Sequence, residues 1–557
     1  MRIAVVPTWD GGGVLRPLAP HGTPLGPPEP VADLAAAVAE RERAGVDRWV
    51  WADADDVYPP LLAAGVRVER CHDVALVEAL LLGHERRFGE PRSLGAAWAR
   101  LHGRPVPKDV GLPATHGADE PATLFLPDRS TLPPGTDRLD ALVEVHADQL
   151  RRIAAAGRPG RFALLCAVES AGALVAAEMT RTGLPWRPDV HDQVLTGLLG
   201  PRPSGGRRPD RLEELAGRIS AALGRQVNPD SPAQLRAAFG AAGHPVESTR
   251  SWVLKQVDHP AVAPLLEYKE LARVHAAHGW NWLDAWVRGG RFRPDYVVGG
   301  VVSGRWATRG GGALQIPRPL RRAVVADPGW RLVVADAGQL EPRVLAAVSG
   351  DRGLAEAARA DDLYTVLGGA FGGDRQRAKI GLLAAMYGQT GGDAAQVLPV
   401  MRSRFPDAMA YVDSAARTGE DGGVVRSWLG RTSPPGDAWE PSGSDPAADD
   451  GARRQGRAAR GRFTRNFVVQ ATAAEWALVL LAALRRGLSA LPSDDGRPEL
   501  VFYQHDEVIV HCPAVRAPDV VAALRAAEAE ARRLLFGDTP VRFPLEAAVV
   551  DCYADAK

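Results

Sequence analysis

The chain has 557 residues, and its 46% hydrophobic and 24% charged side chains are typical of a globular protein with about three or four domain-sized units. Lys and Arg number 67, as do Asp and Glu, so the net charge is zero and a site for a polyanion would depend on local cations. Four scattered cysteines without a CxxC pair indicate neither a zinc site nor a disulfide framework. Because the start lacks a signal-peptide pattern and no run of about eighteen apolar residues occurs, we expect a cytoplasmic protein.

The amino-terminal segment, from residue 1 to about 155, predicts a small α/β unit. Short apolar runs at Ile3–Val6 and Trp49–Trp51 alternate with Ala- and Leu-rich helical patterns, and a Pro-rich loop lies between Pro17 and Pro30. A helical pattern then begins near Arg161 and stops at Gly183, with a proline two residues later. A new domain is predicted to begin there.

The next stretch, residues 200 to 290, is predicted to be mostly helical, with amphipathic patterns broken by prolines. A helical block follows from about 351 to 430, and a segment rich in Pro, Gly, Asp and Ser at Pro434–Gly451 suits a solvated loop. Strand-like segments that could form one antiparallel sheet lie around these blocks, at Arg331–Ala335, Val501–Tyr503, Val508–Val510 and Ala547–Val550.

The first segment with a chemical signature is RLVVADAGQLEPRVLAAVSGD, which places Asp336 directly after an apolar strand. A carboxylate at the exit of a strand can be held rigidly at a cleft because the apolar run anchors it in the core. Glu341 and Arg343 follow just beyond. The alternative is an ordinary strand-to-helix turn that an Asp caps.

A second segment, FYQHDEVIVH, places His505, Asp506 and Glu507 between two short apolar runs. Three ionisable groups inside a buried strand would be costly unless they were paired, solvated or bound to metal. A hairpin turn that presents Asp506 to a metal ion removes the conflict. A solvent-exposed turn without special function is the alternative.

A third segment, GGDRQRAKIGLLAAMYGQTGG, predicts a helix with Asp374 as its N-cap and an end near Gly388. One face of this helix carries four residues at a spacing of four, which are Arg375, Lys379, Leu383 and Tyr387. Two cations, an apolar contact and an aromatic ring on one face suit a polyphosphate, a sugar and a base. A solvated basic turn followed by a buried Tyr is the alternative.

A fourth segment, ARRQGRAARGRFTRNFVVQATAAEW, holds the densest group of cations in the chain. Such a density indicates either a solubilising loop or a contact with backbone phosphates. The cations are Arg453, Arg454, Arg457, Arg460, Arg462 and Arg465.

In content and order, these four segments resemble the conserved motifs of family A DNA polymerases, the bacterial DNA polymerase I type, in an actinobacterial-like short form. The first resembles motif A, usually DYSQIELR, with matches at Asp336, Gln339, Glu341 and Arg343 and departures at Ala337, Gly338 and Pro342. The second resembles motif C, VHDE, at His505, Asp506 and Glu507. The third resembles motif B at Arg375, Lys379, Tyr387 and Gly388, but Leu383 stands where the family has an aromatic residue.

Further similarities extend the resemblance over residues of about 160 to 557. SGRWATRGGGALQIP is similar to TGRLSS...LQNIP, STRSWVL with LLEYKEL is similar to the thumb, and RNFVVQATAAEW is similar to NAPMQGTAAD. The implied fold is an α+β multidomain right hand of palm, thumb and fingers, preceded by a degenerate RNase H-like α/β exonuclease domain. The implied domains are 1–155 for the exonuclease-like part and 156–557 for the polymerase, with the thumb at about 200–295, the palm at about 300–350 and 462–557, and the fingers at about 351–460.

The resemblance implies addition of dNTPs to the 3′-hydroxyl of a primer on a DNA template, in repair or replication, by two-metal phosphoryl transfer. Asp336 and Asp506 would bind two Mg²⁺ ions, with Mn²⁺ as an alternative. Arg375 and Lys379 would bind the triphosphate, and Lys379 would also donate a proton to the leaving group. The cellular setting would be the nucleoid, and the protein would act as a monomer.

The resemblance assigns further roles by position. Tyr387 would pack near the nascent base pair, and Glu341 would exclude a ribose 2′-hydroxyl. His505 and Glu507 would assist near the primer end. The DNA-binding residues would be Arg305 and Gln470, as readers of the minor groove, together with Arg343, Arg462 and Asn466. Leu383 removes a flat ring against the incoming sugar, so we expect weaker dNTP binding.

The amino-terminal unit is similar to a 3′-to-5′ proofreading domain chiefly through CHDVALVEALLLGHERRFGEPRSLGAAWARLHG. Proofreading needs a DxE pair on the first strand, but this chain has Asp10 without a Glu two residues later. Asp55 or Asp56 and Asp148 could take the later acidic positions, and Glu144 replaces the usual Tyr. We therefore predict little or no exonuclease activity, and we also expect no 5′ nuclease.

Two alternatives remain. A single-subunit RNA polymerase shares the two aspartates and the Arg/Lys/Tyr helix, but such enzymes avoid a bulky residue at the position of Glu341. A catalytically inactive DNA-binding relic would fit the degenerate amino-terminal unit and the unusual third segment, although both aspartates and both triphosphate cations are intact.

Overall fold

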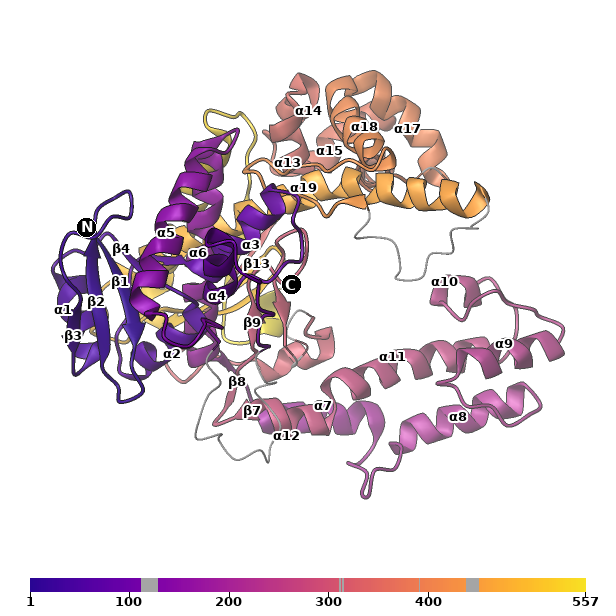
Figure 1. The fold of residues 1–557 in the computed structure, drawn as a ribbon. Helices are drawn as coiled ribbons and strands as arrows, with labels where there is room; N and C mark the ends of the chain where they lie inside the picture. The colour runs from indigo at the N-terminus through magenta and orange to yellow at the C-terminus, as the bar shows by residue number, and fades with distance from the viewer. Residues whose placement is uncertain (112–128, 310–311, 313–314, 390, 437–449, 557) are drawn as a thin grey trace. The chain divides into compact units, whose positions relative to one another are not determined.

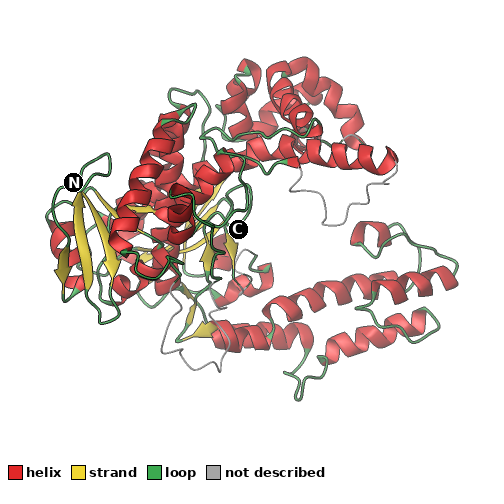
Figure 2. Cartoon of the chain, viewed as in Figure 1, coloured by secondary structure: helices red, strands yellow, loops and turns green. Residues whose placement is uncertain are grey.

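The computed structural model describes residues 1–111, 129–309, 312, 315–389, 391–436 and 450–556 (Figure 1). Most of these residues are helical, and the strands gather into small sheets (Figure 2). The chain divides into two compact units. The larger unit comprises Met1–Thr182, Asp295–Arg309 and Val333–Val549, and the smaller comprises Gly183–Pro294, Gly310–Leu332 and Val550–Lys557.

A five-stranded sheet in the order β3-β2-β1-β4-β5 organises the amino-terminal segment. Strand β1 pairs antiparallel with β2 and parallel with β4. The alternation of side chains buries both faces of the sheet, because Ile3 and Trp49 contribute to one apolar cluster and Ala4 and Val50 to another. The structure therefore has the predicted α/β unit, with strands β1 (Arg2–Pro7), β2 (Gly13–Leu18), β3 (Glu29–Val31), β4 (Arg48–Trp51) and β5 (Cys71–Asp73).

Helices cover the two faces of this sheet. One cluster includes residues of α1 (Leu34–Arg43) and α2 (Ala54–Ala63), and the other includes residues of α4 (Leu94–Leu101) and α5 (Arg138–Ala154). Helix α3 (Val74–His84) follows β5 directly. The larger unit does not end near residue 155, because the next helix packs into the same cluster through Ala173 and Leu174.

That next helix, α6 (Pro159–Thr182), ends where the sequence predicts, at Gly183 with a φ of +73°. The smaller unit begins at the same residue. Helices α6 and α19 (Asp450–Ser489) contain segments long and apolar enough to cross a membrane, but 72% and 89% of those segments are buried within the fold. They are therefore core helices of the larger unit.

A buried ion network joins α6 to the rest of the larger unit. The Glu178 carboxylate accepts hydrogen bonds from Arg485 of α19 at 2.7 Å, from Arg67 at 3.2 Å and from the Tyr58 hydroxyl. Arg67 also donates to Glu499 at 2.7 Å. Removing one partner of such a network would leave an uncompensated buried charge, so the contacts of α2 and Arg67 with α6, α19 and β12 (Glu499–Gln504) depend on one another.

The smaller unit is mainly helical, as predicted for residues 200 to 290. Residues 310–332 and 550–557, which the resemblance assigns to the palm, also cluster with this unit. Trp186, Trp282 and Phe292 form an aromatic cluster at its short three-stranded sheet. Its elements are β6 (Leu184–Pro185), α7 (Pro188–Leu199), α8 (Asp210–Ala222), α9 (Pro232–Ala241), α10 (Ser251–Leu254), α11 (Val262–His278), α12 (Trp280–Trp286), β7 (Val287–Arg288), β8 (Arg291–Phe292), η1 (Arg318–Ala323) and η5 (Tyr553–Ala556).

The remaining strand-like segments form a single four-stranded sheet, as predicted, in the order β12-β13-β11-β14. Strands β12 and β13 pair antiparallel, with Gln504 opposite Glu507. The bounds are β11 (Trp330–Ala337), β12 (Glu499–Gln504), β13 (Glu507–Pro513) and β14 (Leu545–Val550). A separate two-stranded sheet consists of β9 (Tyr296–Val297) and β10 (Ala307–Thr308).

The predicted helical block follows β11. The helices are α13 (Leu340–Ser349), α14 (Arg352–Ala357), α15 (Leu363–Gly368), η2 (Gly369–Phe371), α16 (Arg375–Tyr387), α17 (Asp393–Arg404) and α18 (Pro406–Glu420). Helix α20 (Ala517–Phe536), preceded by η4 (Ala514–Arg516), packs on α19. The predicted loop at 434–451 lies mostly outside the described residues, and α19 already begins at Asp450.

The segment 425–433 is fastened to α19 by a buried carboxyl group. Glu475 is fully buried and accepts hydrogen bonds from the Leu429 N–H at 3.0 Å and from the Ser427 hydroxyl. The neighbouring Thr472 hydroxyl accepts the Trp428 N–H at 3.1 Å. Burial raises the pKa of the Glu475 carboxyl to about 7.

This pKa predicts a pH-dependent stability. The folded state keeps the Glu475 proton up to about pH 7, whereas the unfolded state releases it at the ordinary pKa of a Glu, 4.5. The free energy of unfolding should therefore fall as the pH rises from that ordinary pKa of 4.5 to about 7. The loss should reach about 3 kcal/mol above the folded pKa. Urea unfolding of the wild type and of Glu475→Gln between pH 5 and 8.5 measures it, since the amide does not titrate.

The control is Glu356→Gln, which changes an exposed carboxylate paired with Arg359. Its unfolding free energy should follow the wild-type pH profile. Parallel pH profiles for the wild type and Glu475→Gln would contradict the raised pKa.

Candidate active site

Two predicted carboxylates lie on neighbouring strands of the four-stranded sheet. Asp336 is the penultimate residue of β11, and Asp506 lies in the two-residue turn between β12 and β13. Strand β13 is the neighbour of β11, and the Ala337 N–H donates to the Asp506 carbonyl at 3.0 Å. The two aspartates, which are 170 residues apart in the sequence, therefore meet at one edge of the sheet.

The turn itself is strained. His505 is exposed and has a φ of +55°, a backbone conformation that residues other than glycine seldom adopt. Asp506 is half-buried, and Glu507 begins β13 with only 5% of its surface exposed. The strain is consistent with a turn whose task is to hold Asp506 at the edge of the sheet.

A pocket of about 300 Å³ opens beside Asp506. Of the predicted site residues, it brings together Arg305, Glu341, Tyr387, His505 and Asp506. The lining is completed by Gln339, Leu340, Pro342, Ala473 and Ala474.

The Glu341 carboxylate is fixed inside this pocket from two sides. The Tyr387 hydroxyl donates to its Oε2 at 2.6 Å, and Arg305 forms an ion pair with its Oε1. Burial and the bond to Glu341 raise the pKa of Tyr387 to about 12, so the phenol stays a neutral donor. Gln470 also hydrogen-bonds Tyr387. Three segments that are distant in the sequence therefore hold Glu341 in one position.

Helix α16 has the predicted bounds. The Asp374 side chain accepts the N–H groups of Gln376 and Arg377, and the helix ends at Gly388 with a φ of +68°. Along the predicted face, Arg375 is exposed, Lys379 and Leu383 are half-buried, and Tyr387 lines the pocket. The face thus runs from the exposed Arg375 to the pocket wall at Tyr387.

Arg375 has partners that the sequence did not indicate. Its Nε donates to the Asp362 carboxylate at 2.7 Å, and its guanidinium lies 5.6 Å from the centre of the Tyr364 ring. Although desolvation opposes it, hydrogen bonds from Arg375 and Thr365 hold the pKa of Asp362 well below its ordinary value. Asp362 could be predicted only as the N-cap of α15, because its other contacts are made across the fold.

The prediction that Arg343 binds DNA is wrong. Its side chain is fully buried, and its guanidinium donates to backbone carbonyls and to one amide oxygen within the protein. Because its five N–H groups are used, none remains for a phosphate or a base. The acceptors are the carbonyls of Gly338, Ala358, Ala360, Asp361 and Arg542 and the Oε1 of Gln339.

The cation-rich segment forms the beginning of α19. Arg462 is exposed, and its side chain lies beside Gly388 at the end of α16. Arg465 is buried and donates to the Ala385 carbonyl and to Asp413, so its role is structural. The Asn466 Oδ1 is buried and accepts no hydrogen bond from the described residues. The side chain of Arg453 lies outside the described part of the chain.

The acidic residues predicted for the amino-terminal unit do not meet in one site. Asp10 is exposed in the β1–β2 turn, where it accepts from Thr8 and Gly12. Asp56 is paired with Arg129 at 2.7 Å, and Asp55 with Arg309 at 3.2 Å. Each of these last two carboxylates already has an arginine counter-ion.

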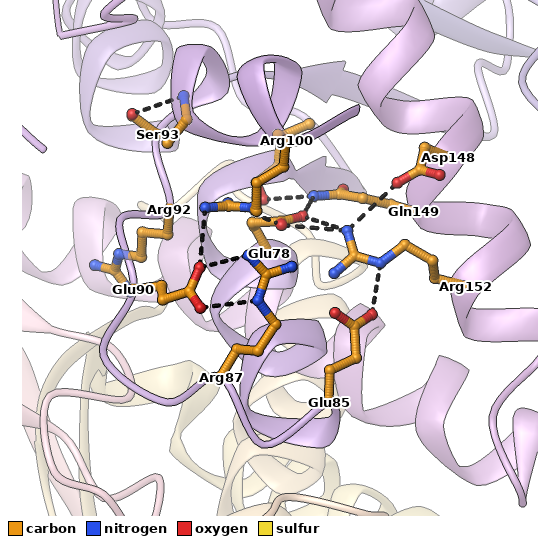
Figure 3. A network of polar contacts seen from close by, with 12 residues as sticks. Glu78, Glu85, Arg87, Glu90, Arg92, Ser93, Arg100, Asp148, Gln149 and Arg152 are labelled. Carbon is orange, nitrogen blue, oxygen red and sulfur yellow. Dashed lines mark hydrogen bonds and ion pairs between the residues drawn. The ribbon is translucent and has the colours of Figure 1, made fainter. Parts of the chain in front are cut away.

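Asp148 belongs to a different charge network on α5 (Figure 3). Arg152 reaches Asp148 at 3.4 Å and also donates to the buried Glu78 at 2.9 Å. Glu144 is paired with His102 at 2.9 Å. Within the described residues, no group of three or more His, Cys, Asp or Glu side chains is arranged to hold a metal ion.

Comparisons with known proteins identify the family of the chain. The family model for DNA polymerase family A matches residues 207–549. DNA polymerase I of Chloroflexus aurantiacus is 28% identical in an alignment of length 396 that covers 62% of this chain and 40% of that protein. The thermostable DNA polymerase I of Thermus aquaticus is 26% identical in an alignment of length 381 that covers 61% of this chain and 43% of that protein. The chain thus matches less than half the length of these relatives.

A solved structure extends the likeness of fold over the whole chain. The POL domain of Pol1 from M. smegmatis, in complex with DNA primer-template and dNTP, has a TM-score of 0.72 at 19% identity, covering 100% of this chain and 95% of that one. The fold is therefore that of a polymerase domain. Since the family model also matches more than half of the chain, the protein belongs to DNA polymerase family A.

Proposed function

We propose that the protein is a DNA-templated DNA polymerase that adds dNTPs to the 3′-hydroxyl of a primer. The observation that carries the proposal is the meeting of Asp336 and Asp506 on neighbouring strands, joined by the 3.0 Å bond from Ala337 to the Asp506 carbonyl. The pocket with Glu341 and Tyr387 opens beside Asp506. Membership of family A gives this arrangement its chemistry.

The donor set at the edge of the sheet fits Mg²⁺. Family A DNA polymerases depend on divalent metal ions, and Mg²⁺ is commonly bound by one or two carboxylates together with phosphates of the substrate. Asp336 on β11 and Asp506 in the turn before β13 are both half-buried carboxylates, so they would hold the ions. Bound there, two Mg²⁺ ions would activate the primer hydroxyl and neutralise the charge of the leaving pyrophosphate.

The side chains of α16 would bind the nucleotide. Arg375 and Lys379 would bind the triphosphate, and Lys379 would donate a proton to the leaving pyrophosphate. Leu383 would face the sugar with less contact than an aromatic ring gives. Tyr387 would pack near the nascent base pair, beside the Glu341 carboxylate that its hydroxyl fixes at 2.6 Å.

The DNA contacts would come from residues near the pocket. Arg305 and Gln470, which both contact the Glu341–Tyr387 pair, would read the minor groove. Arg462, which is exposed, and Asn466, whose buried Oδ1 accepts no hydrogen bond from the described residues, would contact the DNA. His505 and Glu507 would assist near the primer end. We propose that the protein acts as a monomer in the nucleoid of the cytoplasm, in repair or replication.

The amino-terminal unit would lack proofreading activity. A divalent cation at Asp55 or Asp56 would have to displace Arg309 or Arg129. Asp148 is held by Arg151 and Arg152. We therefore propose a structural role for this unit as a degenerate exonuclease domain.

Extension of a primed DNA template by the purified protein with Mg²⁺ and dNTPs tests the polymerase activity. We expect extension by the wild type and at least a thousandfold slower extension by Asp506→Ala, because the variant loses a carboxylate of the donor set; losses of about 10³ are typical of single charge-stabilising groups. Asp551→Ala, a change of an exposed residue paired with Arg331, is the control. If the wild type bound primed DNA but did not extend the primer, the alternative of a catalytically inactive DNA-binding relic would be favoured.

Glu341→Ala tests the predicted exclusion of ribonucleotides. Removing the fixed carboxylate opens space beside Tyr387, so incorporation of rNTPs relative to dNTPs should rise by about tenfold to a hundredfold, as the removal of a steric contact worth ~1–3 kcal/mol would give. Competition between dNTPs and rNTPs on one template measures the ratio. Equal use of both substrates by the wild type would instead favour the RNA polymerase alternative.

A primer with a mismatched 3′ end tests the amino-terminal unit. With Mg²⁺ and without dNTPs, the wild type should leave the mismatch intact, because Asp55, Asp56 and Asp148 are paired with arginines. Loss of the terminal nucleotide is measured on a labelled primer. Metal-dependent removal of the mismatch that disappears in Asp148→Ala would overturn the prediction.

A further inference from the structure

The Asp362 carboxylate lies where three segments of the candidate site meet. Asp362 is the N-cap residue of α15. Its carboxylate contacts Gln339, in the turn between β11 and α13, and Arg375, the first residue of α16. Its Oδ1 accepts the Gln339 amide N–H at 2.8 Å, and its Oδ2 accepts the Arg375 Nε–H at 2.7 Å. The carboxylate therefore bridges the strand turn that carries Asp336 to the helix that carries the predicted triphosphate cations.

The Gln339 side of this bridge is rigid. Gln339 has a left-handed backbone with a φ of +59° and is the N-cap residue of α13, between Asp336 and Glu341. Its Oε1 accepts the Leu363 N–H at 2.9 Å, so its amide is bonded to the start of α15 through both the oxygen and the nitrogen. Its Oε1 also accepts from Arg343 at 3.3 Å, so the amide cannot rotate without losing three hydrogen bonds.

The segment before Asp362 is equally fixed. The buried Arg343 guanidinium donates to the carbonyls of Ala360 and Asp361, the two residues that precede Asp362. The Asp362 side chain also accepts the N–H groups of Tyr364 at 3.0 Å and Thr365 at 3.3 Å. Backbone and side chain of Asp362 are thus both held before any ligand binds.

The Arg375 side of the bridge is different, because it is open. The Arg375 side chain is 52% exposed, and Asp362 engages only its Nε. Within the described residues, neither of its terminal nitrogens has a hydrogen-bond partner, and the Tyr364 ring lies against the guanidinium. An arginine held by Nε keeps the edge formed by its two terminal nitrogens, which is the edge that binds a phosphate with two parallel hydrogen bonds.

We propose that Asp362 is a positioning residue, which holds the Arg375 guanidinium in the orientation that receives the triphosphate and fixes it relative to the strand turn of Asp336. The inference rests on the proposed function. A long exposed Arg side chain would otherwise populate many rotamers, and it would lose that freedom when the nucleotide binds. Because Asp362 restricts the Arg375 rotamers already in the folded protein, this conformational entropy is lost on folding and not on nucleotide binding.

Asp362→Asn tests the proposal with little structural disturbance. Asn caps a helix about as well as Asp, so the bonds to the N–H groups of Tyr364 and Thr365 are kept while the charged bond to Arg375 is lost. In single-nucleotide incorporation, we expect the KM for dNTP to rise about threefold to fivefold, the size of effect that exposed ion pairs give. The kcat should change less than the KM, and the affinity for primer-template should be unchanged.

Asp351→Asn is the matched control. Asp351 is also a helix N-cap in the same helical block, and it accepts the N–H groups of Leu354 at 2.9 Å and Ala408 at 3.2 Å, without a cation. Its KM for dNTP should equal that of the wild type. An equal rise in both variants would overturn the proposal, since it would reflect helix capping alone.

A double-mutant cycle with Arg375→Gln tests whether Asp362 acts through Arg375. In the Arg375→Gln background, the Asp362→Asn change should leave the KM unchanged. A full threefold to fivefold rise in that background would overturn the proposal. A lower KM in Asp362→Asn alone would also overturn it, because Asp362 would then compete with the triphosphate for Arg375.

Direct dNTP binding separates this inference from the proposed function. The Kd of the incoming dNTP is measured calorimetrically on a complex with a dideoxy-terminated primer, where no turnover occurs. Wild-type extension with equal Kd in the wild type and Asp362→Asn would overturn the role of Asp362 alone. A wild type with neither extension nor dNTP binding would overturn both.

Discussion

The buried guanidinium of Arg343 is the contact on which the candidate site depends. It lies on α13, yet it donates to carbonyls before α15, to the Gly338 carbonyl beside Asp336, and to the Arg542 carbonyl before β14. Desolvation lowers the pKa of a buried cation, as it does for Arg343, and six acceptors offset the cost. Lys could not replace these bonds, because its single ammonium group has three donors from one point. The strand turn therefore has one stable position relative to the helices.

Other arginines also link segments that are distant in the sequence, and each has a different effect. Arg305 fixes Glu341 in the pocket, Arg485 joins α19 to α6, and Arg129 and Arg309 neutralise aspartates of the amino-terminal unit. In the candidate site, by contrast, the Arg375 side chain is paired through its Nε and stays 52% exposed.

The sequence predicts the parts of the site that local patterns determine. The strand before Asp336, the hairpin at Asp506 and the bounds of α16 follow from apolar runs, an Asp N-cap and a Gly C-cap, and the structure has each of them. The bridge from Asp362 to Arg375 could not be predicted, because the sequence pattern around Asp362 indicates only the N-cap of a helix. The DNA-binding role of Arg343 was predicted from a motif match, which fixes a residue's place in the chain but not the direction of its side chain.

In the amino-terminal unit, arginines form ion pairs with the carboxylates that the sequence suggested for a metal site. Its sheet brings Asp55 and Asp56 near Arg129 and Arg309, and α5 commits Asp148 to the network of Glu78. Once each carboxylate has a guanidinium partner, binding a metal ion requires breaking an ion pair as well as desolvating the ion. The unit nevertheless contributes Tyr58 and Arg67 to the buried carboxylate of Glu178, which Arg485 of α19 shares. The unit therefore shares a buried ion network with α19, the helix that also contributes Ala473 and Ala474 to the pocket.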